Sequence, residues 1–152
     1  MLNKNILIKK CDNYRRSSSS IVFSNGCFDL LHKGHIDLLS TASKLGEILI
    51  VGLNSDSSIK RIKGPKRPIQ NQEVRKKKLL KLKFVNDVFI FDEDTPLNLI
   101  CMLKPKFLVK GGDYKSEEIV GYNEMQNWGG EVKIVELTPG FSTTISINKK
   151  KL

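Results

Sequence analysis

This 152-residue sequence has few of the residues that form disulfides or bind structural metal ions. It contains three cysteines and two histidines. The cysteines Cys11, Cys27 and Cys101 are odd in number, widely spaced and without a second ligand nearby. This pattern argues against a disulfide framework and against a structural zinc site. With 39% hydrophobic residues, the chain has enough apolar side chains to build one hydrophobic core instead.

Long hydrophobic runs are absent as well. One of the longest apolar stretches covers residues 48–53, far short of the ~20 residues that a membrane span needs. The apolar run at residues 6–8 lies among lysines and is too short to serve as a signal peptide. We therefore expect a soluble, cytoplasmic protein without a membrane partner.

Acidic residues are in deficit. The sequence has 26 lysines and arginines against 16 aspartates and glutamates, which gives a net charge of +10 and favours anionic partners. Aromatic residues make up 7%, and they are not interleaved with the basic residues as in many nucleic-acid-binding proteins. We therefore expect no nucleic-acid partner, because a small polyanion such as a nucleotide suits the charge equally well.

Strand-like and helix-like segments alternate from residue 21 onward. Short apolar runs predict strands at residues 21–23, 48–53, 88–91, 107–109 and 132–137. Apolar spacing and capping residues predict helices at 33–45 (ended by Gly46), 71–84, 96–103 (capped by Thr95) and 121–128, and a short one after Ser142. The predicted fold class is α/β: a single-domain, Rossmann-like, doubly wound parallel sheet of about five strands. Residues 1–20 are predicted to be a loose lead-in with room for one helical turn, and residues 21–152 the domain.

The loop after the first predicted strand carries both histidines. His32 and His35 are three residues apart at a predicted helix start, so they share one face, and Gly34 between them leaves room for a bulky group. Free N–H groups at the helix N-terminus would add an anion site. This arrangement favours donation to phosphate oxygens. The alternative is that one histidine caps the helix and the other packs in the core.

Two further segments are candidates for phosphate binding. Ser142-Thr143-Thr144 follows a Pro-Gly pair and would open the last helix as a second anion cradle, or act as an ordinary N-cap. Lys60, Lys63 and Arg75 would supply mobile positive charge around the Gly64-Pro65 loop, which could close over a triphosphate. The alternative for these basic residues is a solvated surface.

Polar residues and glycines also follow other strand ends, where α/β sheets bind ligands. Asp29 and Asp56 could accept sugar hydroxyls or help to hold Mg²⁺, or they could act as caps. Gly111 and Gly112 permit a flat base to approach the backbone, although a tight turn would also need glycine.

The segment Gly26-Cys-Phe-Asp-Leu-Leu-His-Lys-Gly-His35, together with Gly140-Phe-Ser-Thr-Thr144, resembles the cytidylyltransferase-like nucleotidyltransferases. With Val109-Lys-Gly-Gly-Asp-Tyr114 added, the sequence is most similar to the branch that makes ADP-activated heptose. Leu137-Thr138-Pro139 stands where relatives that use cytidine and glycerol phosphate tend to carry an arginine. The absence of this arginine disfavours the branch that uses cytidine and glycerol phosphate.

The resemblance implies an adenylyltransferase that joins ATP and heptose 1-phosphate, with Mg²⁺ as cofactor, no evident protein ligands for the metal, and a homodimer. It implies catalytic roles for His32, His35, Lys60 and Arg75. It implies nucleotide or phosphate binding by Gly26, Cys27, Phe28, Gly34, Lys63, Gly111, Gly112, Ser142, Thr143 and Thr144, and sugar-phosphate binding by Asp29, Asp56 and Asp113. The alternatives are a cytidylyltransferase acting on glycerol 3-phosphate or another polyol phosphate, and a non-catalytic nucleotide- or RNA-binding module.

Overall fold

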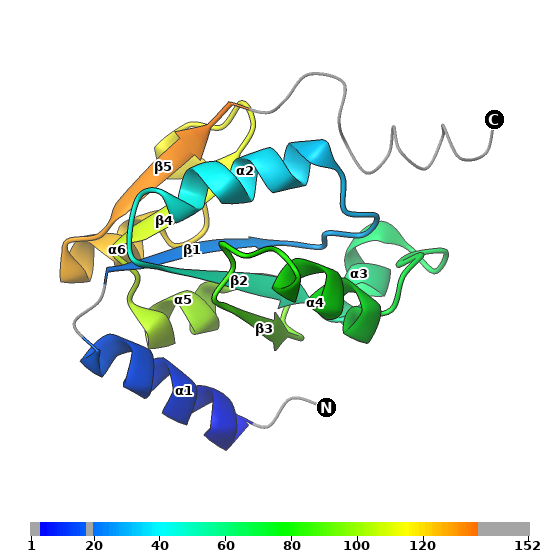
Figure 1. The fold of residues 1–152 in the computed structure, drawn as a ribbon, viewed down its shortest axis with the longest axis horizontal. Helices are drawn as coiled ribbons and strands as arrows, with labels where there is room; N and C mark the ends of the chain where they lie inside the picture. The colour runs from blue at the N-terminus through cyan, green and yellow to red at the C-terminus, as the bar shows by residue number, and fades with distance from the viewer. Residues whose placement is uncertain (1–3, 18–19, 137–152) are drawn as a thin grey trace.

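The structure is a computed structural model that describes residues 4–17 and 20–136. Its centre is a five-stranded parallel sheet with the strand order β3-β2-β1-β4-β5 (Figure 1). The strands are β1 (Ile21–Gly26), β2 (Ile48–Asn54), β3 (Asp87–Phe91), β4 (Phe107–Gly111) and β5 (Glu131–Val135). The predicted α/β, Rossmann-like class is confirmed. β1 and β2 are apolar on both faces because the sheet is covered on both sides.

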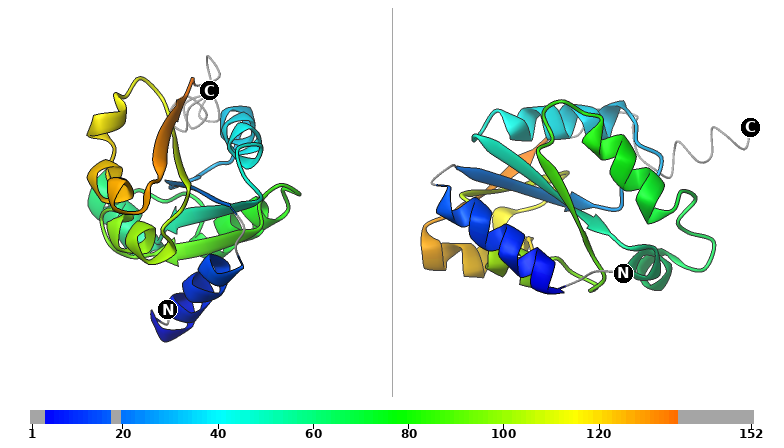
Figure 2. Two further views of the ribbon diagram at one scale, coloured as in Figure 1. Left: turned by 90° about the vertical axis from the view of Figure 1, so that its left-hand side faces the viewer. Right: turned by 60° about the horizontal axis from the view of Figure 1, so that its bottom comes forward.

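Helices cover the two faces of the sheet (Figure 2). The helical elements are α1 (Lys4–Arg16), α2 (Lys33–Ser43), α3 (Asp56–Lys63), α4 (Gln72–Leu80), α5 (Leu97–Leu103), η1 (Ser116–Glu118), α6 (Tyr122–Met125) and η2 (Gln126–Trp128). One core cluster packs Leu39 of α2 and Leu79 of α4 on the sheet. The other packs Ile100 of α5 and Met125 of α6 on the opposite face. Among the described residues, no helix is long and apolar enough to cross a membrane.

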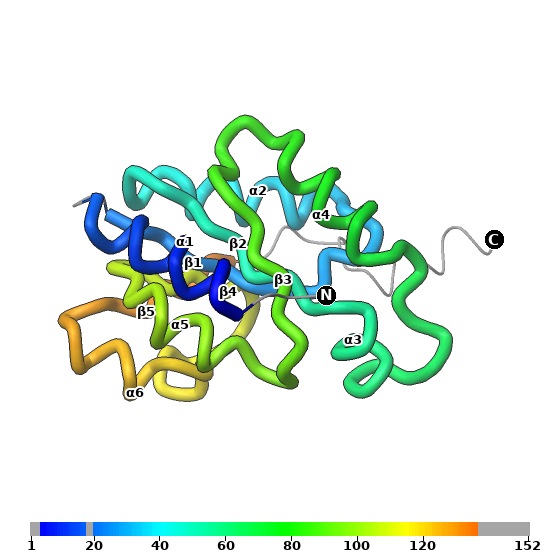
Figure 3. Tube along the Cα trace, turned by 90° about the horizontal axis from the view of Figure 1, so that it is seen from below, coloured from blue at the N-terminus to red at the C-terminus, as the bar shows by residue number. Residues whose placement is uncertain are grey.

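The N-terminal segment differs from the prediction. Residues 4–16 form a thirteen-residue helix, α1, and not a loose lead-in. Leu7, Cys11 and Tyr14 lie on one face of it and join the core cluster beneath α5, and the Tyr14 hydroxyl donates to Asp87 at 2.9 Å. The view from below shows α1 beside α5 (Figure 3). The helix is therefore part of the same folded unit as the sheet.

Three local predictions are also corrected. A helix, α3, occupies residues that were expected to form a flexible basic loop; Ser55 caps it by accepting from the Ser58 N–H. α5 begins one residue later than expected, with Pro96 at the N-cap instead of Thr95. Gly46 does not end a helix in the left-handed conformation. A Cβ there would lie 2.8 Å from Val22 Cγ2, so close packing explains the glycine.

The order of the strands locates the ligand cleft. From β1, the chain adds β2 and β3 on one side and then crosses over to β4 and β5 on the other. Open α/β sheets bind ligands beyond the carboxyl ends of the strands at such a switch point. The loops after β1 and β4 should therefore form the site. The end of the predicted strand at Leu137 and the predicted helix after Ser142 lie outside the described residues.

Candidate active site

The loop between β1 and α2 has an unusual backbone. Phe28 and Leu30 adopt positive φ angles of 46° and 60°, although both carry bulky side chains and both are buried. Left-handed backbone costs such residues roughly 1–2 kcal/mol each. Backbone of this kind persists only where the surrounding contacts fix it, and it is concentrated at functional sites. The sequence gives no direct signal of this conformation.

The two histidines cap α2 reciprocally. His32 Nδ1 accepts hydrogen bonds from the N–H groups of Gly34 at 3.1 Å and His35 at 3.4 Å. In return, the His32 N–H donates to His35 Nδ1 at 3.3 Å. The N–H groups that were expected to be free for an anion are therefore engaged. The ring nitrogens outside this exchange are the two Nε2 atoms, and that of His32 is buried.

The capping bonds define which ring nitrogen carries the proton. A nitrogen that accepts a hydrogen bond is unprotonated, so each neutral ring keeps its proton on Nε2. The rings of His32 and His35 stack at 3.8 Å between centroids, with 16° between their planes. Burial lowers the pKa of both histidines, and for His35, with the added influence of His32 and Lys63, to about 4. At neutral pH each ring of the pair therefore carries its proton on Nε2, and of the two residues His35 lines the pocket described next.

A pocket of about 160 Å³ opens beside His35, between the carboxyl ends of β1 and β4. Its walls come from β1 and the loop that follows it, from α2, from the last turn of α3 and from the end of β4. The described residues that line it are Ser24, Asn25, Gly26, Cys27, Phe28, His35, Leu38, Lys63, Lys110 and Gly111. The pocket thus lies at the switch point of the sheet.

The lining of this pocket is cationic. Lys63 and Lys110 contribute ammonium groups, and none of the described lining residues is a carboxylate. Lys110 was missed by sequence reasoning. The available signal was a lysine at the carboxyl end of an otherwise apolar strand, one residue before the Gly-Gly pair. Such a pocket suits an anionic ligand.

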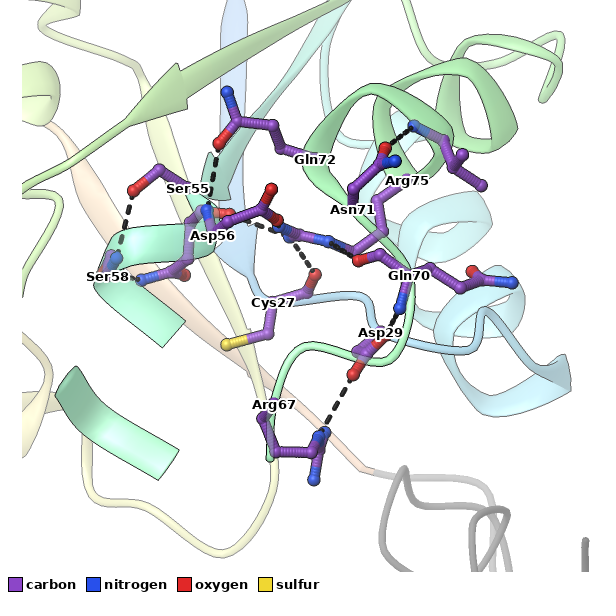
Figure 4. Close-up of polar contacts among 12 residues, drawn as sticks. Cys27, Asp29, Ser55, Asp56, Ser58, Arg67, Gln70, Asn71, Gln72 and Arg75 are labelled. Carbon is purple, nitrogen blue, oxygen red and sulfur yellow. Dashed lines mark hydrogen bonds and ion pairs between the residues drawn. The ribbon is translucent and has the colours of Figure 1, made fainter. Parts of the chain in front are cut away.

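Next to the pocket, Arg75 joins three loops (Figure 4). It is almost fully buried, with 1% of its surface exposed. Its Nη1 donates to the carbonyls of Cys27 at 2.8 Å and Asn54 at 2.7 Å, and its Nε to Gln70 O at 2.9 Å. Its Nη2 contacts Asp56 Oδ1 at 2.8 Å. Arg75 therefore fixes the loops after β1 and β2 to the segment before α4.

Asp29 fixes the same segment from the other side. Its carboxylate is fully buried and accepts from the N–H groups of Ile69 and Gln70 at 2.8 and 2.9 Å. Arg67 Nε donates to it at 3.1 Å. Burial alone would raise the pKa of Asp29, but these hydrogen bonds outweigh it and lower the pKa. We call Asp29, Asp56, Arg67 and Arg75 the clamp.

The clamp gives structural contacts to several residues that were predicted for the site. Arg75 is not a mobile cation, because its described contacts hold it inside the protein. Asp29 accepts hydrogen bonds from the protein, and Asp56 Oδ1 contacts Arg75, so both carboxylates have structural partners; their contacts with a sugar phosphate stay predictions. Lys60 and Lys63 lie on helix α3; of the two, Lys63 lines the pocket. These contacts could not be read from the sequence, because each carboxylate pairs with an arginine from a distant segment.

The other predicted site residues lie in the pocket lining, in helix α2, in the turn after β4 or outside the described residues. Gly26, Cys27, Phe28 and Gly111 line the pocket, and Gly34 is buried in the first turn of α2. Gly112 has a φ of 124°, which favours glycine, and its N–H donates to Val135 O, while Asp113 after it is exposed. Ser142, Thr143 and Thr144 lie outside the described residues.

The described residues do not offer a ready magnesium site. No group of three or more His, Cys, Asp or Glu side chains comes together within residues 4–17 and 20–136. The two aspartates predicted for this task belong to the clamp.

A parallel α/β sheet, a cationic pocket at its switch point and a His-Lys-Gly-His helix start together define a nucleotidyltransferase. The model of the family described as cytidylyltransferase-like matches residues 23–149. The chain therefore belongs to the cytidylyltransferase-like family.

Several individual members of this family are similar to the chain over most of its length. The chain is 49% identical to the bifunctional protein HldE of Syntrophotalea carbinolica over 135 residues, which cover 89% of this chain and 28% of that protein. It is 52% identical to HldE of Campylobacter fetus over 136 residues, or 90% of this chain and 29% of that one. The chain thus spans less than a third of the length of these relatives. The crystal structure of a lipopolysaccharide core biosynthesis protein from Thermoplasma volcanium matches 80% of this chain and 98% of that one, with a TM-score of 0.65 and 29% identity.

Proposed function

We propose that this protein transfers the adenylyl group of ATP to heptose 1-phosphate and releases pyrophosphate. The observation that carries the proposal is the pocket at the switch point. It combines the ammonium groups of Lys63 and Lys110 with the His35 ring, and none of its described lining residues is a carboxylate. An anionic ligand would compensate this charge. The product, an ADP-sugar, would serve as an activated precursor for lipopolysaccharide.

The reaction needs charge stabilisation more than a covalent nucleophile. An oxygen of the sugar phosphate attacks the α-phosphorus of ATP, and the bond from that phosphorus to the bridging oxygen of pyrophosphate breaks. The Nε2–H groups of His32 and His35 would donate to the phosphate oxygens as negative charge develops. Lys63 would compensate the leaving pyrophosphate. ATP would enter as its Mg²⁺ complex, and we propose that the reaction takes place in the cytoplasm.

The clamp supports this chemistry indirectly. Arg75 holds the Cys27 carbonyl, and Asp29 holds the segment at residues 69–70, so the strained loop keeps its shape. Pre-organised donors cost no rearrangement in the transition state. We therefore place Arg75 among the residues that position the site. Ser142 and Thr143 remain our proposal for the β- and γ-phosphates, and Lys60 and Asp113 for groups at the rim.

The choice of ATP and heptose rests on sequence likeness. The Lys-Gly-Gly-Asp-Tyr and Ser-Thr-Thr segments are similar to the ADP-heptose branch. The likeness to two proteins named HldE and to one named for lipopolysaccharide core biosynthesis supports the same choice. The family description, in contrast, names cytidylyl transfer. The base and the acceptor must therefore be tested together.

Pyrophosphate release should be measured with MgATP or MgCTP, each offered with heptose 1-phosphate or glycerol 3-phosphate. We expect release with ATP and the heptose. The control is His35→Asn, because the asparagine Oδ1 can replace Nδ1 as the acceptor for the His32 N–H while the Nε2–H donor is lost. Release with CTP and glycerol phosphate would move the protein to the cytidylyltransferase branch. If none of the four substrate pairs releases pyrophosphate, the proposed activity is refuted and a non-catalytic binding module is favoured.

A further inference from the structure

Lys110 has no hydrogen-bond or ion-pair partner among the residues that the structure describes. It is the last residue but one of β4 and lines the pocket together with Cys27 and His35. Within the described part of the chain, no carboxylate forms an ion pair with its ammonium group, and no hydrogen bond from it is found. The cations of the clamp, by contrast, are paired with Asp29 and Asp56.

The surroundings of Lys110 disfavour its charge. Burial lowers the pKa of Lys110, and the nearby Cys27 opposes this only in part. Lys63 lines the same pocket and adds a second positive charge. A cation that is partly desolvated and lacks a counter-ion costs folding free energy, so its place in an open pocket points to a ligand that compensates it.

We infer that Lys110 binds a phosphoryl oxygen of the substrate in this pocket and is a further substrate-binding residue. The inference rests on the proposed function and deepens it. The phosphoryl group could belong to the nucleotide or to the acceptor sugar phosphate, since both carry the same chemistry. If Lys110 were only structural, its aliphatic stem would pack in the pocket wall, and removing its charge would not change the affinity for either ligand.

The test uses Lys110→Met, which keeps an unbranched side chain and removes the charge, and Lys110→Arg, which keeps the charge. Lys115→Met is the matched control, because Lys115 is exposed in the loop that follows β4. Binding of MgATP is measured by calorimetry without an acceptor, and the KM for heptose 1-phosphate is measured with saturating MgATP. Thermal melting checks that each variant is folded.

We expect Lys110→Met to weaken one of the two ligands by about tenfold, the typical effect of one hydrogen bond to a charged group. Weaker MgATP binding assigns Lys110 to the nucleotide, and a raised KM at unchanged MgATP affinity assigns it to the acceptor. Lys110→Arg should recover most of the loss, and Lys115→Met should match the wild type. If folded Lys110→Met retains both values, the inference is overturned.

A second measurement needs no variant. Lysines of the wild-type protein are acetylated with acetic anhydride, with and without MgATP or heptose 1-phosphate, and the modified sites are counted by mass spectrometry. Protection of Lys110, but not Lys115, by either ligand supports the inference, and equal modification in all samples contradicts it. If the wild type binds no MgATP at all, the proposed function itself fails, and this outcome is distinct from an unaffected Lys110 variant.

Discussion

Two groups of charged side chains lie at the same edge of the sheet and differ in how their charge is compensated. In the clamp, Asp29 and Arg75 are fully or almost fully buried, and each makes several hydrogen bonds inside the protein. In the pocket, Lys63 and Lys110 face a space without any carboxylate among its described lining residues. The contrast separates residues that shape the site from the lysines that we propose to bind the ligand.

The difference has a general physical meaning. A buried charge that is fully hydrogen-bonded contributes to the architecture, and removing one member leaves the others unpaired at a cost of several kcal/mol. A charge at the wall of an open pocket is compensated by water or, once one is bound, by an anionic ligand. Residue type alone does not distinguish the two cases: Arg75 and Lys63 are both basic residues near the same pocket, yet only Lys63 lines it.

The largest effect on stability is expected for Arg75→Met. The substitution removes hydrogen bonds to the Cys27, Asn54 and Gln70 carbonyls and leaves Asp56 without its partner. We expect a loss of about 4 kcal/mol in the free energy of unfolding, measured by urea denaturation. A loss below about 1 kcal/mol would show that the clamp does not hold the loops.

The next effect concerns the histidines and should fall on catalysis alone. His32→Asn keeps a side-chain acceptor at a position where asparagine is a preferred N-cap, so the melting temperature should stay close to that of the wild type. The Nε2–H donor is lost, and we expect the rate of pyrophosphate release to fall by roughly 10²–10³. A folded His32→Asn protein with full activity would mean that His32 is only a helix cap.

Acid should destabilise the protein through His35. Its pKa is about 4 in the folded protein, below the ordinary value of 6.5, because burial and the neighbouring His32 and Lys63 disfavour its charge. Stability from the neutral ring is therefore complete above pH ~6.5 and is lost as the pH falls towards 4. Between pH 7.5 and pH 5, the wild type should lose about 2 kcal/mol more than His35→Asn, as measured by urea denaturation at both pH values. Equal losses would contradict the low pKa.

The smallest effect is expected at an exposed ion pair close to the same helix start. Lys33 Nζ lies 2.7 Å from Asp37 Oδ2, and the two side chains are 64% and 41% exposed. Lys33→Ala should change the free energy of unfolding by no more than about 0.5 kcal/mol and leave pyrophosphate release unchanged. A larger change in activity would show that the helix start depends on more than its two histidines.

Much of the fold could be predicted from local sequence. The apolar runs at residues 48–53 and 88–91 are strands because both faces of the sheet are covered. Helix α1 was missed although Leu7, Cys11 and Tyr14 have helical spacing, since their partners in the core come from distant segments. Helix α3 carried two signals, Ser55 as the cap and basic residues in its last turn.

The site was only half predictable. His32 and His35 could be found because the chain has no other histidines and these follow a strand end. The role of Arg75 could not be found, because its partners Cys27 and Asn54 lie 48 and 21 residues away in sequence. Lys110 could not be singled out because its burial, and the absence of a counter-ion for it among the described residues, follow from the fold.

The central claim is that the uncompensated cations of the pocket form a nucleotide phosphate site. The direct test is a calorimetric titration of MgATP into the wild type and into the double variant Lys63→Met/Lys110→Met, at low and at moderate salt. We predict saturable 1:1 binding to the wild type with a shallow salt dependence, and strongly weakened binding to the folded double variant. Equal affinity of both proteins for MgATP, or no saturable binding by the wild type, would contradict the claim. Binding of RNA with a steep salt dependence in place of ATP would assign the basic surface to another partner.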